Sequence, residues 1–107
     1  MSTFANPPRY SVEAAEAYVT ALLDLLGDQD PYAVLAATPT ALREATAGMD
    51  DAARTTPEAE GKWSVHDVVA HLVDSEVVYG YRMRLIVAAD RPAIPGYDQD
   101  AWAARLH

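Results

Sequence analysis

Two histidines and a glutamate in "KWSVHDVVAHLVDSE", residues 62–76, are the side chains best suited to chemistry in this sequence. His66 and His71 are two of its three histidines. Histidines on one helix share a metal ion when they lie three or four residues apart. These two are five apart, which separates them by about 140° around a helix axis. They therefore do not chelate one ion from a regular helix.

His71 is the stronger candidate of the two. It lies near the edge of a predicted apolar stripe, one turn after Asp67 and one turn before Ser75. Helical bundles build their metal sites from side chains that face neighbouring helices. The alternative is a histidine that is hydrogen-bonded at a seam between helices. His66 falls in the first turn, away from the stripe, and we expect it to be solvated.

Glu76 lies in the middle of the same stripe, between Leu72 and Met83. A carboxylate buried there must be paired, hydrogen-bonded or protonated, because an isolated buried charge is too costly. It is then either a structural acceptor, for example for the indole of Trp63 or Trp102, or a metal ligand or general base. The sequence leaves both roles open.

A long helix over about 64–89 carries these side chains. Ser64 is a typical N-cap, Asp67 three residues later makes an approximate capping box, and "DRPAIPG" ends the helix. Apolar residues recur along it at helical spacing and predict one core-facing stripe. The stripe consists of Val65, Val68, Val69, Leu72, Tyr79, Met83, Ile86 and Val87.

The other main helix is expected at about 11–26. Ser11 is a plausible N-cap, Gly27 supplies the C-terminal stop, and the leucines between them are predicted to face inward. Nothing in the chain reads as a strand, so the predicted fold class is all-α.

Shorter helices are expected elsewhere. An aspartate and a threonine that each precede a proline predict helix starts, and hence short helices at about 31–37 and 39–47. The stretch 50–61 has little hydrophobic periodicity and is predicted to be a loop. A final short helix is expected to begin at Asp98.

Length and composition narrow the class of protein. With 107 residues, half of them apolar, the chain is predicted to form a single domain over 1–107. Its formal charge of −8 disfavours binding to phosphate backbones, so no nucleic-acid partner is expected. Cysteine is absent, and we see no signal peptide or membrane-length apolar run. We therefore expect a soluble cytoplasmic protein without a membrane partner.

The sequence motifs also resemble those of a known family. The run "GKWSVHDVVAHLVDSEVVYGYRMR", followed by "IPGYDQDAWAARL", is similar to the DinB-like (damage-inducible, YfiT-related) family. The upstream "DPYAVLAATPTALREATAGM" fits the same family. The resemblance covers the chain from about residue 18 onward.

The resemblance implies a four-helix bundle that holds a divalent metal, zinc or nickel, through three histidines. The "AHL" of the long helix matches one ligand position, which implies a metal-ligand role for His71. The other two ligands of such proteins belong to a His-xxx-His on a late helix, and this chain has no such motif. The resemblance also implies a relation to thiol-dependent transferases or metal-dependent hydrolases that act on a small-molecule substrate.

We expect the family pattern to be incomplete here, because the sequence reaches His107 before the two further long helices of such proteins. The wide apolar stripe on helix 64–89 would then lack its cover, and self-association as a homodimer or higher oligomer would supply one. We therefore expect the two main helices and the short helices to form a complete bundle only when chains associate.

Three functional hypotheses follow. The first is a DinB-like divalent-metal protein with an incomplete site at His71, inactive as this chain, with no catalytic residue assigned. The second is a non-catalytic helical module for dimerisation or protein contacts. The third is a metal-free small-molecule binder whose pocket is lined by Tyr79, Tyr97 and Trp102.

Overall fold

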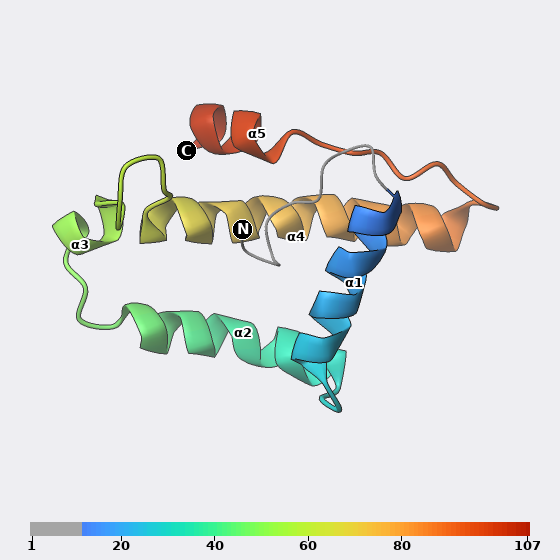
Figure 1. Ribbon diagram of the computed structural model, residues 1–107, viewed down its shortest axis with the longest axis horizontal. Coiled ribbons are helices and arrows are strands. Elements are labelled where there is room, and N and C mark those ends of the chain that lie inside the picture. Colours follow the sequence, from blue (N-terminus) through green and yellow to red (C-terminus); the bar gives the residue numbers. More distant parts are fainter. Residues whose placement is uncertain (1–11) are drawn as a thin grey trace. The chain divides into compact units, whose positions relative to one another are not determined.

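Helices make up all the regular structure between residues 12 and 107, the part of the chain that the computed structural model describes (Figure 1). This confirms the all-α prediction. No helix in that range combines the length and the apolarity that crossing a membrane requires. The helices are α1 (Val12–Leu26), α2 (Pro31–Thr46), α3 (Asp51–Thr55), α4 (Val65–Ala88) and α5 (Gln99–Leu106).

The chain divides into two compact units, one ending at Ala47 and the other running from Gly48 to His107. The first contains α1 and α2, and the second contains α3, α4 and α5. A single domain over 1–107 stays a prediction.

Helix α1 ends where the sequence predicts. Gly27 follows its last residue with a φ of 57°, and the Gly27 N–H donates to the carbonyl of Leu23 at 2.9 Å. Glycine adopts this left-handed conformation without steric cost, so it closes the helix. The predicted cap at Ser11 lies outside the described residues. Leu22 and Leu23 are not covered by the unit that ends at Ala47, and their inward orientation stays a prediction.

The two short helices predicted at 31–37 and 39–47 are instead one continuous helix, α2. Thr38 does not cap a new helix, because its hydroxyl donates to the carbonyl of Val34, one turn back, at 2.8 Å. Pro39 lies inside the helix, where it lacks the N–H that would bond to the preceding turn. The chain tolerates that loss, so a proline after a capping residue was not sufficient evidence for a helix start.

The prediction of a loop over 50–61 is also corrected. Asp50 begins the short helix α3, because its carboxylate accepts a hydrogen bond from the backbone N–H of Ala53 at 2.8 Å. This is a side-chain cap of the ordinary kind. Periodicity alone misses such a helix, since five residues are too few to show an apolar stripe.

The long helix α4 has the cap that the sequence indicates. The backbone N–H of Asp67 donates to the Ser64 hydroxyl at 3.2 Å, and the backbone N–H of Ser64 donates to the Asp67 carboxylate at 2.9 Å. Both halves of the capping box are present. The helix ends at Ala88, within one residue of the predicted end.

The chain then turns back and packs against one side of α4. Figure 1 shows the connection and α5 running along α4 in the opposite direction. Helix α5 begins after Asp98, as predicted, with the Asp98 carboxylate accepting from the backbone N–H of Ala101 at 3.1 Å. The buried residues of α4 are one turn apart: Ala70, Asp74 and Val78.

The predicted apolar stripe is not the packed side of α4. Each residue turns the helix by about 100°, so the centre of the stripe lies half a turn around the α4 axis from Asp74. Most of its side chains are exposed, up to 88% for Val87. Within the unit formed by residues 48–107, the stripe is therefore not the packed core.

We predict that Ser64→Ala destabilises the unit formed by residues 48–107 by about 1 kcal/mol, because α4 loses its N-cap. Urea unfolding followed by circular dichroism measures the change. Ser75→Ala is the matched control, since the Ser75 hydroxyl only bonds back to the carbonyl of His71 within the helix. Equal losses in the two variants would show that the capping box is unimportant.

Candidate functional site

The buried carboxylate of the chain is Asp74, not Glu76. Its Oδ2 lies 2.9 Å from Nε2 of His107, at the end of α5. The side chains are 9% and 23% exposed, respectively. A buried carboxylate needs such a partner, because its desolvation is otherwise uncompensated. The pair therefore holds the end of α5 against the middle of α4.

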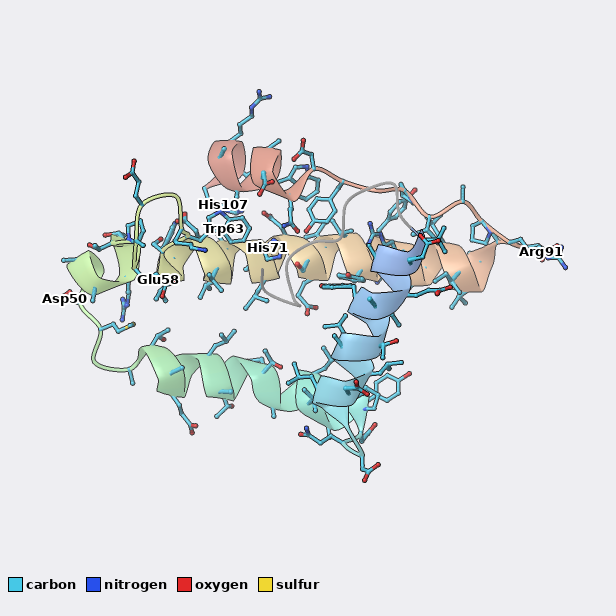
Figure 2. All side chains as sticks on the ribbon, in the orientation of Figure 1. Asp50, Glu58, Trp63, His71, Arg91 and His107 are labelled. Carbon is cyan, nitrogen blue, oxygen red and sulfur yellow. The ribbon has the colours of Figure 1, made fainter. Side chains whose placement is uncertain are left out.

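His71 lies on α4 one turn before Asp74, and its half-buried imidazole packs against the ring of Trp63. The ring centroids are 5.1 Å apart, with an angle of 54° between the ring planes. Figure 2 shows Trp63, His71 and His107 gathered along the first half of α4. The structure thus brings His71 near a histidine–carboxylate pair that is formed by residues 33 positions apart.

Asp67 adds a negative charge at the start of α4. The backbone N–H of Ser64, the Ser64 hydroxyl and the nearby His66 and His107 hold the pKa of the Asp67 carboxyl below its ordinary value of 3.8, against a smaller opposing effect of desolvation. The hydrogen bonds from Ser64 are the main cause. This carboxylate therefore acts mainly as part of the helix cap.

The other predicted candidates lie away from this cluster. His66 is exposed, as expected. Glu76 is also exposed and makes no hydrogen bond or ion pair with another described residue. The interpretation of Glu76 as a buried acceptor for Trp63 or Trp102 is therefore wrong, because its carboxylate bonds to neither indole within the unit formed by residues 48–107.

The aromatic residues proposed for a pocket form a clasp around Arg82 instead. Nη2 and Nε of Arg82 donate to the carbonyl of Pro95 at 2.8 and 3.2 Å. The guanidinium carbon lies 5.2 Å from the ring centroid of Tyr79 and 6.0 Å from that of Tyr97. Tyr97 in turn packs edge-on against Trp102 at 4.9 Å. These contacts favour a structural role, in which the clasp fixes the returning chain on α4.

Residues 12–107 do not assemble a complete metal centre. No group of three or more His, Cys, Asp or Glu side chains in that range is placed to hold an ion. His71 is a suitable nitrogen donor, but a tetrahedral site needs four ligands. Asp74 and His107 already bond to each other. The donors within this range therefore fit part of a metal site at most.

Sequence reasoning missed the Asp74–His107 pair. Asp74 sits outside the apolar stripe, where an acidic residue normally faces water. Its partner is distant in sequence, so local spacing gives no sign of the contact. One signal in the sequence pointed to Asp74. It lies three residues after His71, so the two side chains are neighbours on one side of the helix.

The protein is thus all-helical, with a half-buried histidine beside a histidine–carboxylate pair. The sequence model of the DinB superfamily matches residues 35–105, which is more than half of the chain. The chain therefore belongs to the DinB superfamily. The matched stretch includes Trp63, His71 and Asp74.

Curated relatives support the same assignment. A protein of Geobacillus thermodenitrificans is 30% identical over 103 residues, 96% of this chain and 51% of its own length. YfiT of Bacillus subtilis is 39% identical over 70 residues, 65% of this chain and 39% of its own length. Both carry the name "putative metal-dependent hydrolase". No solved structure gives a significant match.

The chain spans about half the length, or less, of these two relatives. What their names say about activity therefore describes proteins with about half of their length or more outside the matched region.

We predict that Asp67 makes the stability of the unit formed by residues 48–107 depend on pH below about pH 4. Because its pKa is lowered in the folded state, Asp67 contributes stability above 3.8 that is lost as the pH falls through the lower folded value. Asp67→Asn removes this part of the pH dependence. Urea midpoints measured across the acid range should show the two proteins converging at the lowest pH. Parallel curves would contradict the proposed role of Asp67.

We predict that His107→Ala destabilises the same unit by roughly 1–3 kcal/mol, because Asp74 is left buried without its partner. The double variant Asp74→Ala/His107→Ala should recover part of that loss, since no unpaired carboxylate remains. Arg105→Ala is the matched control from the exposed side of α5. Unfolding followed by tryptophan fluorescence measures these proteins and the single variant Asp74→Ala, which completes the cycle. Strictly additive effects would show that the two side chains do not interact.

Proposed function

We propose that this chain is part of a metal-dependent protein of the DinB superfamily, in which His71 provides one ligand to a divalent metal ion. The observation that carries the proposal is the family match over His71, together with the metal-dependent names of the relatives. The remaining ligands belong outside residues 12–107, because no complete ligand set forms within that range. Zinc and nickel are the metals proposed, since both suit imidazole nitrogen.

The surroundings of His71 support a ligand role. The indole of Trp63 covers one side of the imidazole and restricts its rotation, which reduces the entropy lost when a ligand is fixed. The nearby Asp74–His107 pair provides a polar, hydrogen-bonded boundary, as the outer shell of a metal site requires. The side chain is half-buried, so it is shielded on one side and open on another.

The proposed reaction class is hydrolysis or thiol-dependent transfer on a small-molecule substrate. A divalent metal supplies a Lewis acid and an activated water or thiol in such reactions. Residues 12–107 are proposed to contribute the position of one ligand rather than a whole active site. No residue of the chain is therefore assigned a catalytic proton transfer.

A second candidate function is a non-catalytic helical module that binds another protein. The observation that favours it is the exposed apolar stripe of α4. Soluble monomers rarely expose large contiguous apolar patches, and such a patch often marks an interaction surface. Metal binding that depends on His71 distinguishes the two functions, because an interaction module does not require a metal ligand at that position.

We predict that Ni²⁺ quenches the fluorescence of Trp63 when it binds at His71, because the two rings are 5.1 Å apart. Titration of the full chain should give saturable quenching, with matching binding by calorimetry with Ni²⁺ and Zn²⁺. His71→Ala should weaken binding by about tenfold or more, since a ligand is lost. Trp63→Phe should remove the optical signal and leave the calorimetric one.

His66→Ala is the matched control, because it removes an exposed histidine from the same helix. It should bind Ni²⁺ as the wild type does. Equal weakening in the His66 and His71 variants would indicate non-specific binding to surface histidines and would refute the proposed ligand role. Unchanged Ni²⁺ binding in the His71→Ala variant would likewise refute the ligand role and would favour the interaction module.

A further inference from the structure

The last part of the chain, residues 89–107, forms a strap that returns along α4 and includes helix α5 (Figure 1). No residue of α5 is buried within the unit formed by residues 48–107, so polar and aromatic contacts rather than an apolar core hold the strap in place. The strap leaves α4 through a bend at Arg91, whose φ of 46° is one that non-glycine residues rarely adopt. Such a bend persists only where the surrounding contacts fix the chain.

Two anchors fix the strap at separate positions on α4. At one anchor, the guanidinium of Arg82 donates two hydrogen bonds to the carbonyl of Pro95, at 2.8 and 3.2 Å. At the other, the carboxylate of Asp74 bonds to the imidazole of His107 at 2.9 Å. Arg82 comes eight residues after Asp74. The anchors are therefore about 12 Å apart along α4, at 1.5 Å per residue.

A continuous series of contacts joins the two anchors through the strap. The guanidinium carbon of Arg82 lies 6.0 Å from the ring centroid of Tyr97, and this ring packs edge-on against Trp102 at 4.9 Å. Trp102 belongs to α5, which ends directly before His107. Packed side chains and rigid helices carry energetic coupling between separate positions. Loosening the anchor at Arg82 is therefore expected to loosen the anchor at His107.

The end of the strap lies beside the turn of α4 that carries His71. Asp67 is four residues before His71 and Asp74 is three residues after it, which places all three on one side of the helix. His107 bonds to Asp74. The pKa of Asp67 is lowered mainly by hydrogen bonds from Ser64 and, to a smaller extent, by the nearby charge of His107. One imidazole of the strap thus interacts with carboxylates on both sides of His71.

Packing rather than hydrogen bonding orients the imidazole of His71. Among the described residues, this ring makes no hydrogen bond and contacts the ring of Trp63, with 5.1 Å between the centroids. The side chain of a metal ligand must be held close to its productive geometry by its neighbours. The end of the strap lies on the same side of α4, so we expect its docking to limit the rotation of the imidazole.

We propose that Arg82 and His107 are positioning residues for His71, because the strap that they anchor holds the His71 imidazole in place. Arg82 thereby affects a side chain that lies 11 residues earlier on α4, about 16 Å along the helix axis. The effect on metal binding rests on the proposed ligand role of His71. The effect on the orientation of the imidazole does not.

Histidine modification of the metal-free full chain tests the positioning directly. Diethyl pyrocarbonate modifies imidazole nitrogens, and peptide mass spectrometry gives the rate at each histidine. The variants Arg82→Ala and His107→Ala should each speed up modification of His71, with the rate at His66 of the same helix as the internal reference. Faster amide exchange in α5 should accompany this change, because the strap is loosened. Arg84→Ala is the matched control, since Arg84 donates to a carbonyl of its own helix, and it should keep the wild-type rates.

Nickel titration of the same variants measures the coupling to metal binding. Arg82→Ala should weaken Ni²⁺ binding by about fivefold or more, as coupling between two sites ordinarily does, whereas Arg84→Ala should not. The double variant Arg82→Ala/His107→Ala should weaken binding by less than the product of the two single effects, because both act through one strap. Circular dichroism and urea unfolding confirm that each variant is folded.

A wild-type rate of His71 modification in Arg82→Ala, or an equal rise in Arg84→Ala, would overturn the inference. Fully multiplicative effects of the two anchors on nickel affinity would also overturn it, because they would show that the anchors act independently. Nickel binding that does not depend on His71 refutes the proposed ligand role instead. In that case the modification rates still decide whether the strap positions His71.

Discussion

The placement of Asp74 constrains the rest of the unit formed by residues 48–107. A carboxylate on a side chain that is only 9% exposed is stable only when it is bonded or protonated. His107 satisfies it from the last residue of α5, so the chain must turn back after α4 and run antiparallel to it. The Arg82–Pro95 contact fixes the middle of that return path. Two polar contacts, rather than a large apolar core, thus determine which side of α4 is covered.

This choice of side explains the exposed surface of the molecule. The returning chain covers a strip of α4 whose buried residues are Ala70, Asp74 and Val78. The larger apolar residues of α4 remain on the opposite side. Burial of apolar area is the main favourable term in folding, so the exposed stripe is apolar area that the unit formed by residues 48–107 does not bury by itself.

Helix ends were more predictable from the sequence than helix contacts. The start of α4 at Ser64 and the end of α1 at Gly27 follow from local chemistry, because caps act within one turn of the backbone. The predicted division of α2 at Pro39 was wrong because the Thr38 hydroxyl bonds back to the carbonyl of Val34 instead of capping a new helix. The partners of α4 were not predictable in the same way, since periodicity identifies an apolar side without identifying what covers it.

The candidate site shows the same contrast between local features, which the sequence predicts, and contacts between helices, which it does not. His71 was identified from its position and from the family resemblance, and the structure adds its contact with Trp63. The Asp74–His107 pair required the three-dimensional structure, because it joins two residues from different helices.

The candidate ligand and the contact that fixes α5 lie on neighbouring parts of α4. The imidazole of His71 packs against the ring of Trp63, and Asp74, three residues later, bonds to His107 at the end of α5. Residues three apart on a helix are neighbours on its surface. The pair that holds α5 on α4 therefore also defines the surroundings of His71, so the packing of this unit and the geometry of the candidate site depend on the same contact.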